Sequence, residues 1–292
     1  MLKRKNKEDI AFDGVNYFLL TIILFATLYP FYYLLITSFN SGSDSLLGGS
    51  YFWPSDYTLE NYSTFFTQKK WLIAFFVSVM RTVIGAVTGV FFTCLVAYGL
   101  SHRYLVFKNF YFVVVIFAMY FSGGLIPYYV VLRSLGLLNT FGVYIIPSLL
   151  NTFFLLIAIS FFREIPSDLK ESAYIDGANE LTIFYKIILP VSKPLMATMA
   201  LFLGVGQWNS WLDASYFVRN ENLRTLTYRM IEIINKSEVP RESIAQAAGA
   251  SDVTSYSLQV TAMVVSIVPI ICVYPFLQKY FVHGIMLGAV KE

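Results

Sequence analysis

The chain has 292 residues, of which 57% are hydrophobic, 18% aromatic and only 13% charged. A soluble protein carries about twice that charged fraction, so this composition excludes an ordinary soluble domain. The net charge of +3, with basic residues scattered over the chain, also argues against a nucleic-acid-binding face.

Six nearly uncharged stretches follow one another along the chain. A helix rises about 1.5 Å per residue, so about 20 apolar residues cross a hydrocarbon core of roughly 30 Å. The sequence therefore predicts an all-α membrane protein with six transmembrane helices. The predicted spans are residues 15–38, 82–101, 109–128, 141–162, 194–214 and 257–279.

Residues 1–14 form a short tail before the first span. The first apolar run is longer than a signal-peptide core and no small-x-small cleavage site follows it, so we expect an uncleaved span. Basic residues favour the cytoplasmic side, which predicts that both chain termini are cytoplasmic. The tail's basic residues are Lys3, Arg4, Lys5 and Lys7.

The second span contains Gly85 and Gly89 at G-x-x-x-G spacing, which favours the close approach of another helix. Cys94 and Cys272 both lie inside predicted spans, where we expect them to be buried as small apolar side chains rather than to form a disulfide. We expect no metal or cofactor site in the chain.

A polar segment, residues 163–193, separates the fourth and fifth spans. Ser167 can cap a helix that begins at Asp168, whose carboxylate suits the positive helix end. Asp176 and Gly177 can stop that helix, because glycine enters the left-handed region without steric cost.

A second helix is predicted after this turn. Asn179 can cap it, and we expect it to run over residues 180–189 and to be terminated by Pro190. Its predicted apolar stripe consists of Leu181, Phe184 and Ile188. By spacing alone, a well-built linker between two spans is the better explanation of the whole segment.

Residues 171–190 also carry a spaced motif. The matching positions are Glu171, Ala173, Asp176, Gly177, Ala178, Phe184, Ile187, Leu189 and Pro190. The motif resembles the cytoplasmic EAA loop of binding-protein-dependent ABC importers, which reads EAA, then DGA three residues later, then F, I and LP. Ser172 departs from it, with a hydroxyl where the family usually has a methyl group. The resemblance implies a type I ABC importer permease fold, with one permease domain over residues 15–292.

In that family the residues around the glycine turn form a coupling helix, which sits in a cleft of a separate ATPase. The Glu171 position commonly pairs there with a basic group of the ATPase. The resemblance thus implies roles in ATPase coupling for Glu171, Ser172, Ala173, Asp176, Gly177, Ala178, Phe184 and Pro190.

The chain has no G-x-x-x-x-G-K-[ST] pattern and no Gly-Lys pair, so we expect a transport subunit without an ATPase site of its own. ATP and Mg²⁺ would be bound by partner subunits. The resemblance implies a complex in the cytoplasmic membrane of a bacterium, without nucleic acid. Its other members would be a second permease subunit, two ATPase subunits and an extracellular substrate-binding protein.

Four further stretches resemble the carbohydrate branch of these permeases, and most of all its LplC/YtcP-type members. These are residues 121–127, 208–214, 274–281 and 284–291. Such members are similar to the smaller permease subunit of the maltose importer, and the resemblance implies a cargo of oligosaccharides or polysaccharide fragments. A non-sugar solute carried by the same machinery is the alternative.

A polar and aromatic cluster lies in the outer half of the fifth span. A cluster at that depth faces protein or water rather than lipid, and indole faces and amides suit a sugar ring. We therefore predict a substrate path along Gln207, Trp208, Asn209 and Trp211. Helix–helix hydrogen bonds and an interfacial aromatic belt are the alternative, which weighs more for Trp211 and Asp213.

Residues 215–256 form the longest predicted outer segment. Within it, apolar residues at helical spacing predict a short amphipathic helix, which either lies on the bilayer interface or forms a docking surface for an outside partner. These residues are Leu226, Met230, Ile233 and Ile234.

Two other classes are disfavoured. An ion-coupled secondary transporter should carry ionisable groups inside its spans, whose middles here are nearly free of them. A membrane enzyme should show a catalytic pattern such as H-E-x-x-H or G-x-S-x-G, and the sequence contains neither.

Overall fold

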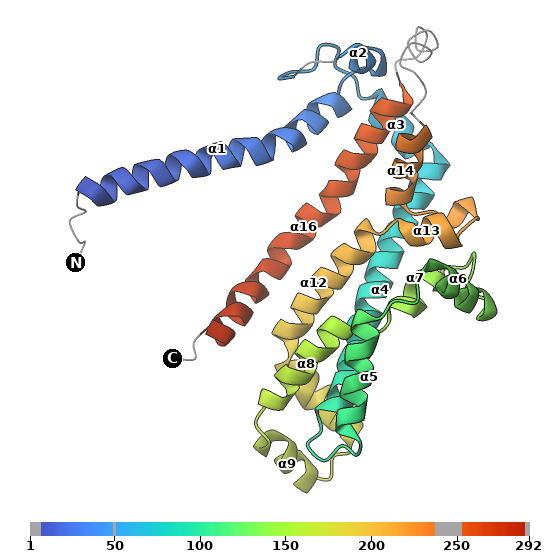
Figure 1. The fold of residues 1–292 in the computed structure, drawn as a ribbon. Helices are drawn as coiled ribbons and strands as arrows, with labels where there is room; N and C mark the ends of the chain where they lie inside the picture. Colours follow the sequence, from blue (N-terminus) through green and yellow to red (C-terminus); the bar gives the residue numbers. More distant parts are fainter. Residues whose placement is uncertain (1–6, 49–50, 237–252, 290–292) are drawn as a thin grey trace. The chain divides into compact units, whose positions relative to one another are not determined.

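The computed structural model describes residues 7–48, 51–236 and 253–289, so the first six residues of the predicted tail lie outside it. Within these ranges the regular elements are helices, and the one β contact is an isolated bridge between Asn40 and Tyr57 (Figure 1). The predicted all-α class is confirmed. Helices suit this composition because they satisfy their own backbone hydrogen bonds without water.

Three helical stretches are long and apolar enough to cross a membrane unbroken. They are Ala11–Ser38, Lys69–Ser101 and Ser255–Val273. The other three predicted spans are pairs of helices joined at a sharp bend. Counting each bent pair as one span gives up to six crossings, in agreement with the predicted six.

The first bent pair replaces the predicted span 109–128. It consists of α5 (Lys108–Tyr120) and α6 (Leu125–Ser134), which meet at 115°. The prediction of one straight helix was wrong here because residues 121–124 leave the helix. Gly124 has a φ of +84°, a conformation that glycine adopts without strain.

The other two pairs are bent less sharply. One joins α7 (Gly142–Ile145) and η1 (Ile146–Ser148) to α8 (Thr152–Glu164) at 45°. The other joins the helical stretch Glu180–Val191 to α12 (Lys193–Asn209) at 80°. The fifth predicted span, 194–214, is therefore too long, because α12 ends at Asn209 and a separate short helix, α13 (Leu212–Phe217), follows.

By their contacts, the residues form two compact units, which are Met1–Lys69 with Glu232–Val268, and Lys70–Ile231 with Pro269–Glu292. The first unit contains α1 (Lys7–Ser38), α2 (Gly42–Leu47), α3 (Glu60–Thr67) and the first part of α16 (Ser255–Ala289). The buried Asn61 amide joins α3 to the end of α1 by donating to the carbonyls of Ser38 (3.1 Å) and Asn40 (2.8 Å). The expected single permease domain stays a prediction.

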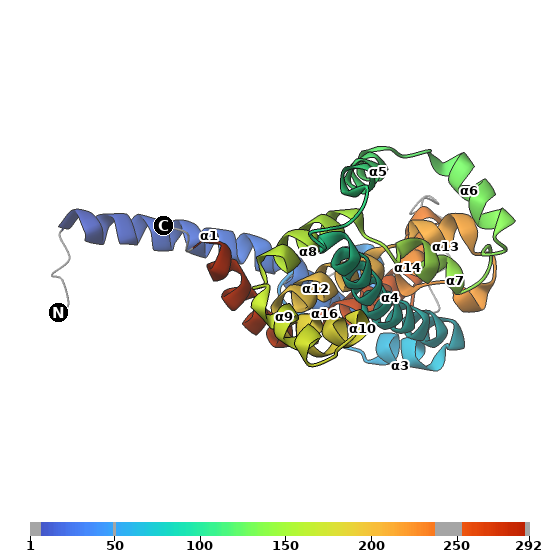
Figure 2. The ribbon, with the colours of Figure 1, turned by 90° about the horizontal axis from the view of Figure 1, so that it is seen from below.

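The second unit has two apolar cores. The larger lies among α4 (Lys69–Ser101), α8, α9 (Asp168–Ile175), α12 and the segment between α9 and α12. The smaller joins α6, α7 and α13. Figure 2 looks onto α9 and shows it at one end of this unit, beside α8, with α10 (Glu180–Ile183) close by.

The predicted close approach at Gly85 and Gly89 is confirmed. A Cβ atom at Gly85 would lie 2.9 Å from Gln207 Cδ, and one at Gly89 would lie 3.4 Å from Leu203 Cδ1, both on α12. Glycine at these two positions thus lets α12 pack directly against the backbone of α4.

The two cysteines are free thiols that differ in exposure. Cys94 is buried, as predicted, but Cys272 is exposed, so that prediction was wrong. α16 is apolar around its whole circumference, and such a sequence gives no sign of which face is covered.

The predicted amphipathic helix is present as α14 (Leu226–Lys236). Leu226 at its start is buried, and its N–H donates to the Ser78 hydroxyl over 2.8 Å. Residues 237–252 of the predicted outer segment lie outside the described part of the chain. A bilayer-surface role and a docking role for this helix both stay open.

Candidate functional site

The 163–193 loop folds as helix, glycine turn, helix, as predicted. α9 ends at a Schellman turn, in which Gly177 donates to the Tyr174 carbonyl (3.0 Å) and Ala178 to the Ala173 carbonyl (2.9 Å). Gly177 has a φ of +79° and no atom within 4 Å of the place where a Cβ would stand. Backbone conformation rather than space therefore favours glycine at this position.

The caps of the two helices differ from each other. Asn179 caps α10 as predicted, with its Oδ1 accepting from the Thr182 N–H over 2.8 Å. Ser167 does not cap α9 with its side chain, so that prediction was wrong. Ser167 already has helical dihedral angles, and its carbonyl instead accepts the N–H groups of Lys170 and Glu171.

The helix predicted over residues 180–189 is interrupted. α10 passes into a wider π-type turn, Phe184–Ile188, and then into α11 (Leu189–Val191). Pro190 does not end the helix, because it sits in the first turn of α11, where a missing N–H costs nothing. The chain instead bends at Ser192, which is fully buried.

The apolar stripe of this segment is also shifted. Phe184 and Ile188 are fully buried as predicted, together with Ile183. Leu181 is 59% exposed, so its predicted place in the stripe was wrong. It lies in the first turn of α10, outside the larger core.

The residues predicted to couple an ATPase fall into three groups by their exposure. Ala173 and Phe184 are buried, and the Phe184 ring lies 5.3 Å from the Tyr98 ring of α4, so these side chains seat the loop on the core. Ala178 is half-buried. The exposed group, which is available to a partner, consists of Glu171, Ser172, Asp176, Gly177 and Pro190.

Glu180 holds the two arms of the loop to the end of α4. Its carboxylate accepts from the Tyr98 hydroxyl over 2.6 Å and from the Tyr174 hydroxyl, and His102 Nε2 lies 3.5 Å away. The hydrogen bond to Glu180, helped by partial burial, raises the pKa of Tyr174 to about 12, so this phenol stays a donor at neutral pH. Lys170 lies over the Tyr98 ring, and burial lowers its pKa.

No local pattern predicts this cluster. The sequence marks Glu180 only as the start of a helix, and its partner Tyr98 lies 82 residues away, at the end of another helix. An isolated sequence carries no sign of such a pairing.

At the other end of the second unit, Arg81 forms a buried network that no local pattern in the sequence predicts either. Arg81 is 2% exposed, because α4 begins well before the predicted span and places it inside the helix. Its guanidinium donates to Gln207 Oε1 (2.7 Å), to the Ser210 carbonyl (3.2 Å) and to Asp213, and lies over the Tyr144 ring. Arg81 thus supplies hydrogen-bond donors where α12 breaks and its last carbonyls need partners.

These contacts bear on the predicted substrate path. Gln207 is 9% exposed and also donates to Ser148 Oγ over 2.7 Å, while Trp208 is 6% exposed with its ring against Phe75. For these two residues the geometry supports the alternative of helix–helix bonding within the chain. Asn209 is exposed and Trp211 half-buried, so both can face a path.

Three comparisons with known proteins agree with this architecture. Residues 81–287 match the family described as "Binding-protein-dependent transport system inner membrane component". Protein LplC of Bacillus subtilis (strain 168) is 36% identical, over 98% of this chain and 96% of its own length. The polygalacturonan/rhamnogalacturonan transport system permease protein YtcP of the same strain is 35% identical, over 97% of this chain and 99% of its own.

A solved structure is similar over nearly the whole length. It is described as a bacterial ABC transporter involved in the import of the acidic polysaccharide alginate. The match has a TM-score of 0.87 at 30% identity and covers 95% of this chain and 99% of that one.

Proposed function

Because this chain belongs to the family of inner membrane components of binding-protein-dependent transport systems, we propose that it is a permease subunit of an ATP-driven importer of oligosaccharides or polysaccharide fragments. The observation that carries the proposal is the 163–193 loop, which exposes the glycine turn and Glu171 at one end of the second unit while Phe184 seats it in the core. Both features suit a loop that transmits the movement of a bound partner subunit into the helix bundle.

The sugar cargo rests on the relatives. LplC-like similarity covers almost the whole chain, and YtcP and the alginate transporter are both named for polysaccharides. An arabinooligosaccharide permease, AraQ of Halalkalibacterium halodurans, is 29% identical over 99% of this chain. A non-sugar solute is the alternative cargo, and the names of these relatives favour it less than a sugar.

The chain would work within a complex. A second permease subunit would complete the path, two ATPase subunits would bind ATP and Mg²⁺, and an extracellular binding protein would deliver the cargo. The 163–193 loop and both chain termini would then face the cytoplasm. The chain itself would hold no ATPase site and no cofactor.

The way the loop is built supports the proposed coupling role. An ATPase that closes on the exposed residues, Glu171 among them, would move α9 and α10 together, since both are tied through Glu180 to the end of α4. The chain would then shift its populations between an inward-open and an outward-open packing, because the ATPase makes different contacts with the two packings.

The test is ATP hydrolysis by the reconstituted complex. The chain would be purified in lipid with its co-eluting ATPase and permease, and hydrolysis would be followed with the binding protein and a panel of neutral and acidic oligosaccharides. We expect stimulation by one sugar class, abolished by Glu171→Lys. Glu164→Lys, an equal charge reversal at an exposed position of the same loop but outside the motif, is the matched control and should keep the stimulation.

Two results would contradict the proposal. One is that no ATPase co-elutes with the chain. The other is that hydrolysis responds to sugar equally in the wild type and in Glu171→Lys.

A further inference from the structure

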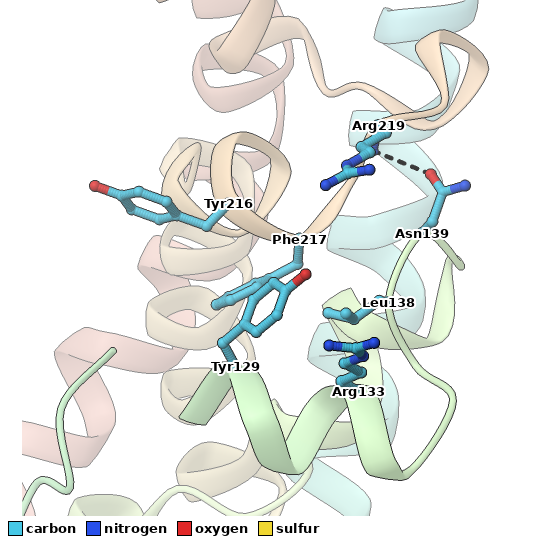
Figure 3. A pocket seen from close by; sticks show the side chains of 7 residues that line it. All are labelled: Tyr129, Arg133, Leu138, Asn139, Tyr216, Phe217 and Arg219. Atoms are coloured by element: carbon cyan, nitrogen blue, oxygen red, sulfur yellow. Dashed lines mark hydrogen bonds between the residues drawn. The ribbon is translucent and has the colours of Figure 1, made fainter. Parts of the chain in front are cut away.

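A hollow of about 430 Å³ lies in the second unit between α6, the turn that follows it and the end of α13 (Figure 3). It is away from α9, at the end where α12 stops. Ligand pockets in proteins have volumes of about 300–1,000 Å³, so one sugar ring with its substituents fits here.

The hollow is rich in hydrogen-bond donors. Arg133, in the last turn of α6, and Arg219, just after α13, both direct their guanidinium groups into it, and the Tyr129 hydroxyl points the same way (Figure 3). Its lining residues include no carboxylate. The site therefore offers two positive charges and no negative one.

Asn139 fixes the two arginine-bearing segments to each other. It has a φ of +59°, and its backbone N–H donates to the Phe217 carbonyl over 2.8 Å. Its side-chain oxygen accepts from the backbone N–H groups of Arg219 (3.0 Å) and Asn220 (2.7 Å). Since its oxygen is used in this way, the amide of Asn139 has only donors left for a ligand.

The arginines of the hollow differ from their neighbours in the chain. The guanidiniums of Arg224 and Arg229 lie 3.6 and 3.8 Å from the carboxylate of Glu221. Among the described residues, no carboxylate lies within ion-pair distance of Arg133 or Arg219. The hollow thus holds two guanidinium groups that the described part of the chain does not neutralise.

The apolar wall is aromatic. Phe217 is 5% exposed and forms the base of the wall, and the half-buried Tyr129 ring lies 6.2 Å from it. An aromatic face accepts the C–H side of a sugar ring, while a single guanidinium group suits a planar carboxylate through two parallel hydrogen bonds.

From this combination we infer that the hollow binds a carboxylate-bearing sugar unit, such as a uronate, of an acidic oligosaccharide. The inference rests on the proposed function and narrows its cargo. Arg133 and Arg219 supply the positive charge that attracts the carboxylate, Tyr129 contacts the ring, and Asn139 fixes the backbone segment that carries Arg219 to the turn that follows α6.

The test is direct binding to the full chain in nanodiscs of zwitterionic phosphatidylcholine, measured by calorimetry. The probe is trigalacturonate, and the comparison ligand is its methyl ester, which has the same rings without the charge. We expect the acid to bind at least tenfold more tightly than the ester, and its affinity to fall with added salt, because exposed charges are screened.

Variants then locate the site. Arg133→Gln and Arg219→Gln should each weaken trigalacturonate binding by about fivefold to tenfold, the range expected for one charge-assisted contact at a partly exposed site. Lys70→Gln removes an equal charge from an exposed position near the start of α4 and should leave the affinity unchanged. Both arginines are exposed, so the variants should fold, and unchanged thermal unfolding would verify this.

Several results would overturn the inference. The ester could bind as tightly as the acid, or the double arginine variant could keep the wild-type affinity. Acetate at equal ionic strength could also displace bound trigalacturonate as effectively as added trigalacturonate does. If the arginine variants instead weaken only the docking of the binding protein, the ligand is an acidic protein surface and the sugar site is rejected.

The outcome is separable from that of the proposed function. If Arg133→Gln and Arg219→Gln leave the stimulation of ATP hydrolysis unchanged with every acidic cargo, the importer role stands and the proposed sugar site is rejected. Loss of all sugar stimulation in the wild-type complex removes the importer role, while calorimetry on the chain alone still decides the site.

Discussion

Gly177 allows the loop mechanism to be tested apart from side-chain contacts. Its φ of +79° is strained for any residue with a Cβ, yet no atom lies within 4 Å of the place where that Cβ would stand. Gly177→Ala therefore changes the conformational energy of the turn and no packing. A left-handed conformation costs an alanine about 1–2 kcal/mol, which multiplies local opening of the turn by about 5–30.

Hydrogen exchange measures this opening directly. The amides of residues 176–178 are all bonded in the turn, to the carbonyls of Ser172, Tyr174 and Ala173. We expect their exchange to quicken by about 5–30-fold in Gly177→Ala, and by less in Gly177→Asn, because asparagine tolerates the left-handed region better. ATP hydrolysis in the complex should lose part of its response to sugar in the same order.

The matched control is Gly206→Ala. Gly206 also has no atom within 4 Å of its Cβ position, but it lies inside α12 with an ordinary φ. Alanine there should be neutral or stabilise the helix by up to about 1 kcal/mol. Two results would refute the claim that the turn depends on the conformational freedom of glycine. One is that the amides of residues 176–178 exchange in Gly177→Ala at the wild-type rate, and the other is that the two substitutions have equal effects.

Two further substitutions test the packing that carries the loop. Gly85→Ala places a Cβ 2.9 Å from Gln207 and should destabilise the chain by about 1–3 kcal/mol in thermal or denaturant unfolding. Gly89→Ala should cost less, because the nearest neighbour of its Cβ would be 3.4 Å away. The reverse order would contradict the described α4–α12 contact. Phe184→Ala empties a fully buried site and should lower the free energy of unfolding by about 3–5 kcal/mol and make the loop sensitive to proteases. Leu181→Ala, at an exposed site, should do neither. Equal protease sensitivity of the two variants would show that Phe184 does not hold the loop on the core.

Much of the fold was predictable because it depends on local pattern. The six apolar runs, the glycine turn at Gly177 and the Asn179 cap all follow from neighbouring residues, and each is present in the structure. The predicted ends of the helices failed where distant residues decide them. α12 stops at Asn209 rather than continuing to residue 214, and the carbonyl of Ser210 at that break accepts from Arg81, 129 residues earlier in the sequence.

The candidate sites divide in the same way. The motif of the 163–193 loop is contiguous and was found from the sequence. By contrast, the Glu180 cluster and the hollow between Arg133 and Arg219 bring together residues that lie 82 and 86 positions apart. Arg133 and Arg219 belong to separate segments of the sequence, and the turn at Asn139 brings both to one cavity.

α4 is the element that relates the two ends of the second unit. Near its end, Tyr98 is bonded to Glu180 of the loop, and in its first half Arg81 is bonded to Gln207 and to the break after α12. Between these points Gly85 and Gly89 let α12 pack against it without intervening side chains. If the loop couples to an ATPase as proposed, its displacement would reach two closely packed helices. The helix break after α12 and the bend between α7 and α8 are the places where the backbone could absorb it. Any substrate path along Asn209 and Trp211 would lie at the break after α12, where a movement of the loop would change the accessibility of those residues.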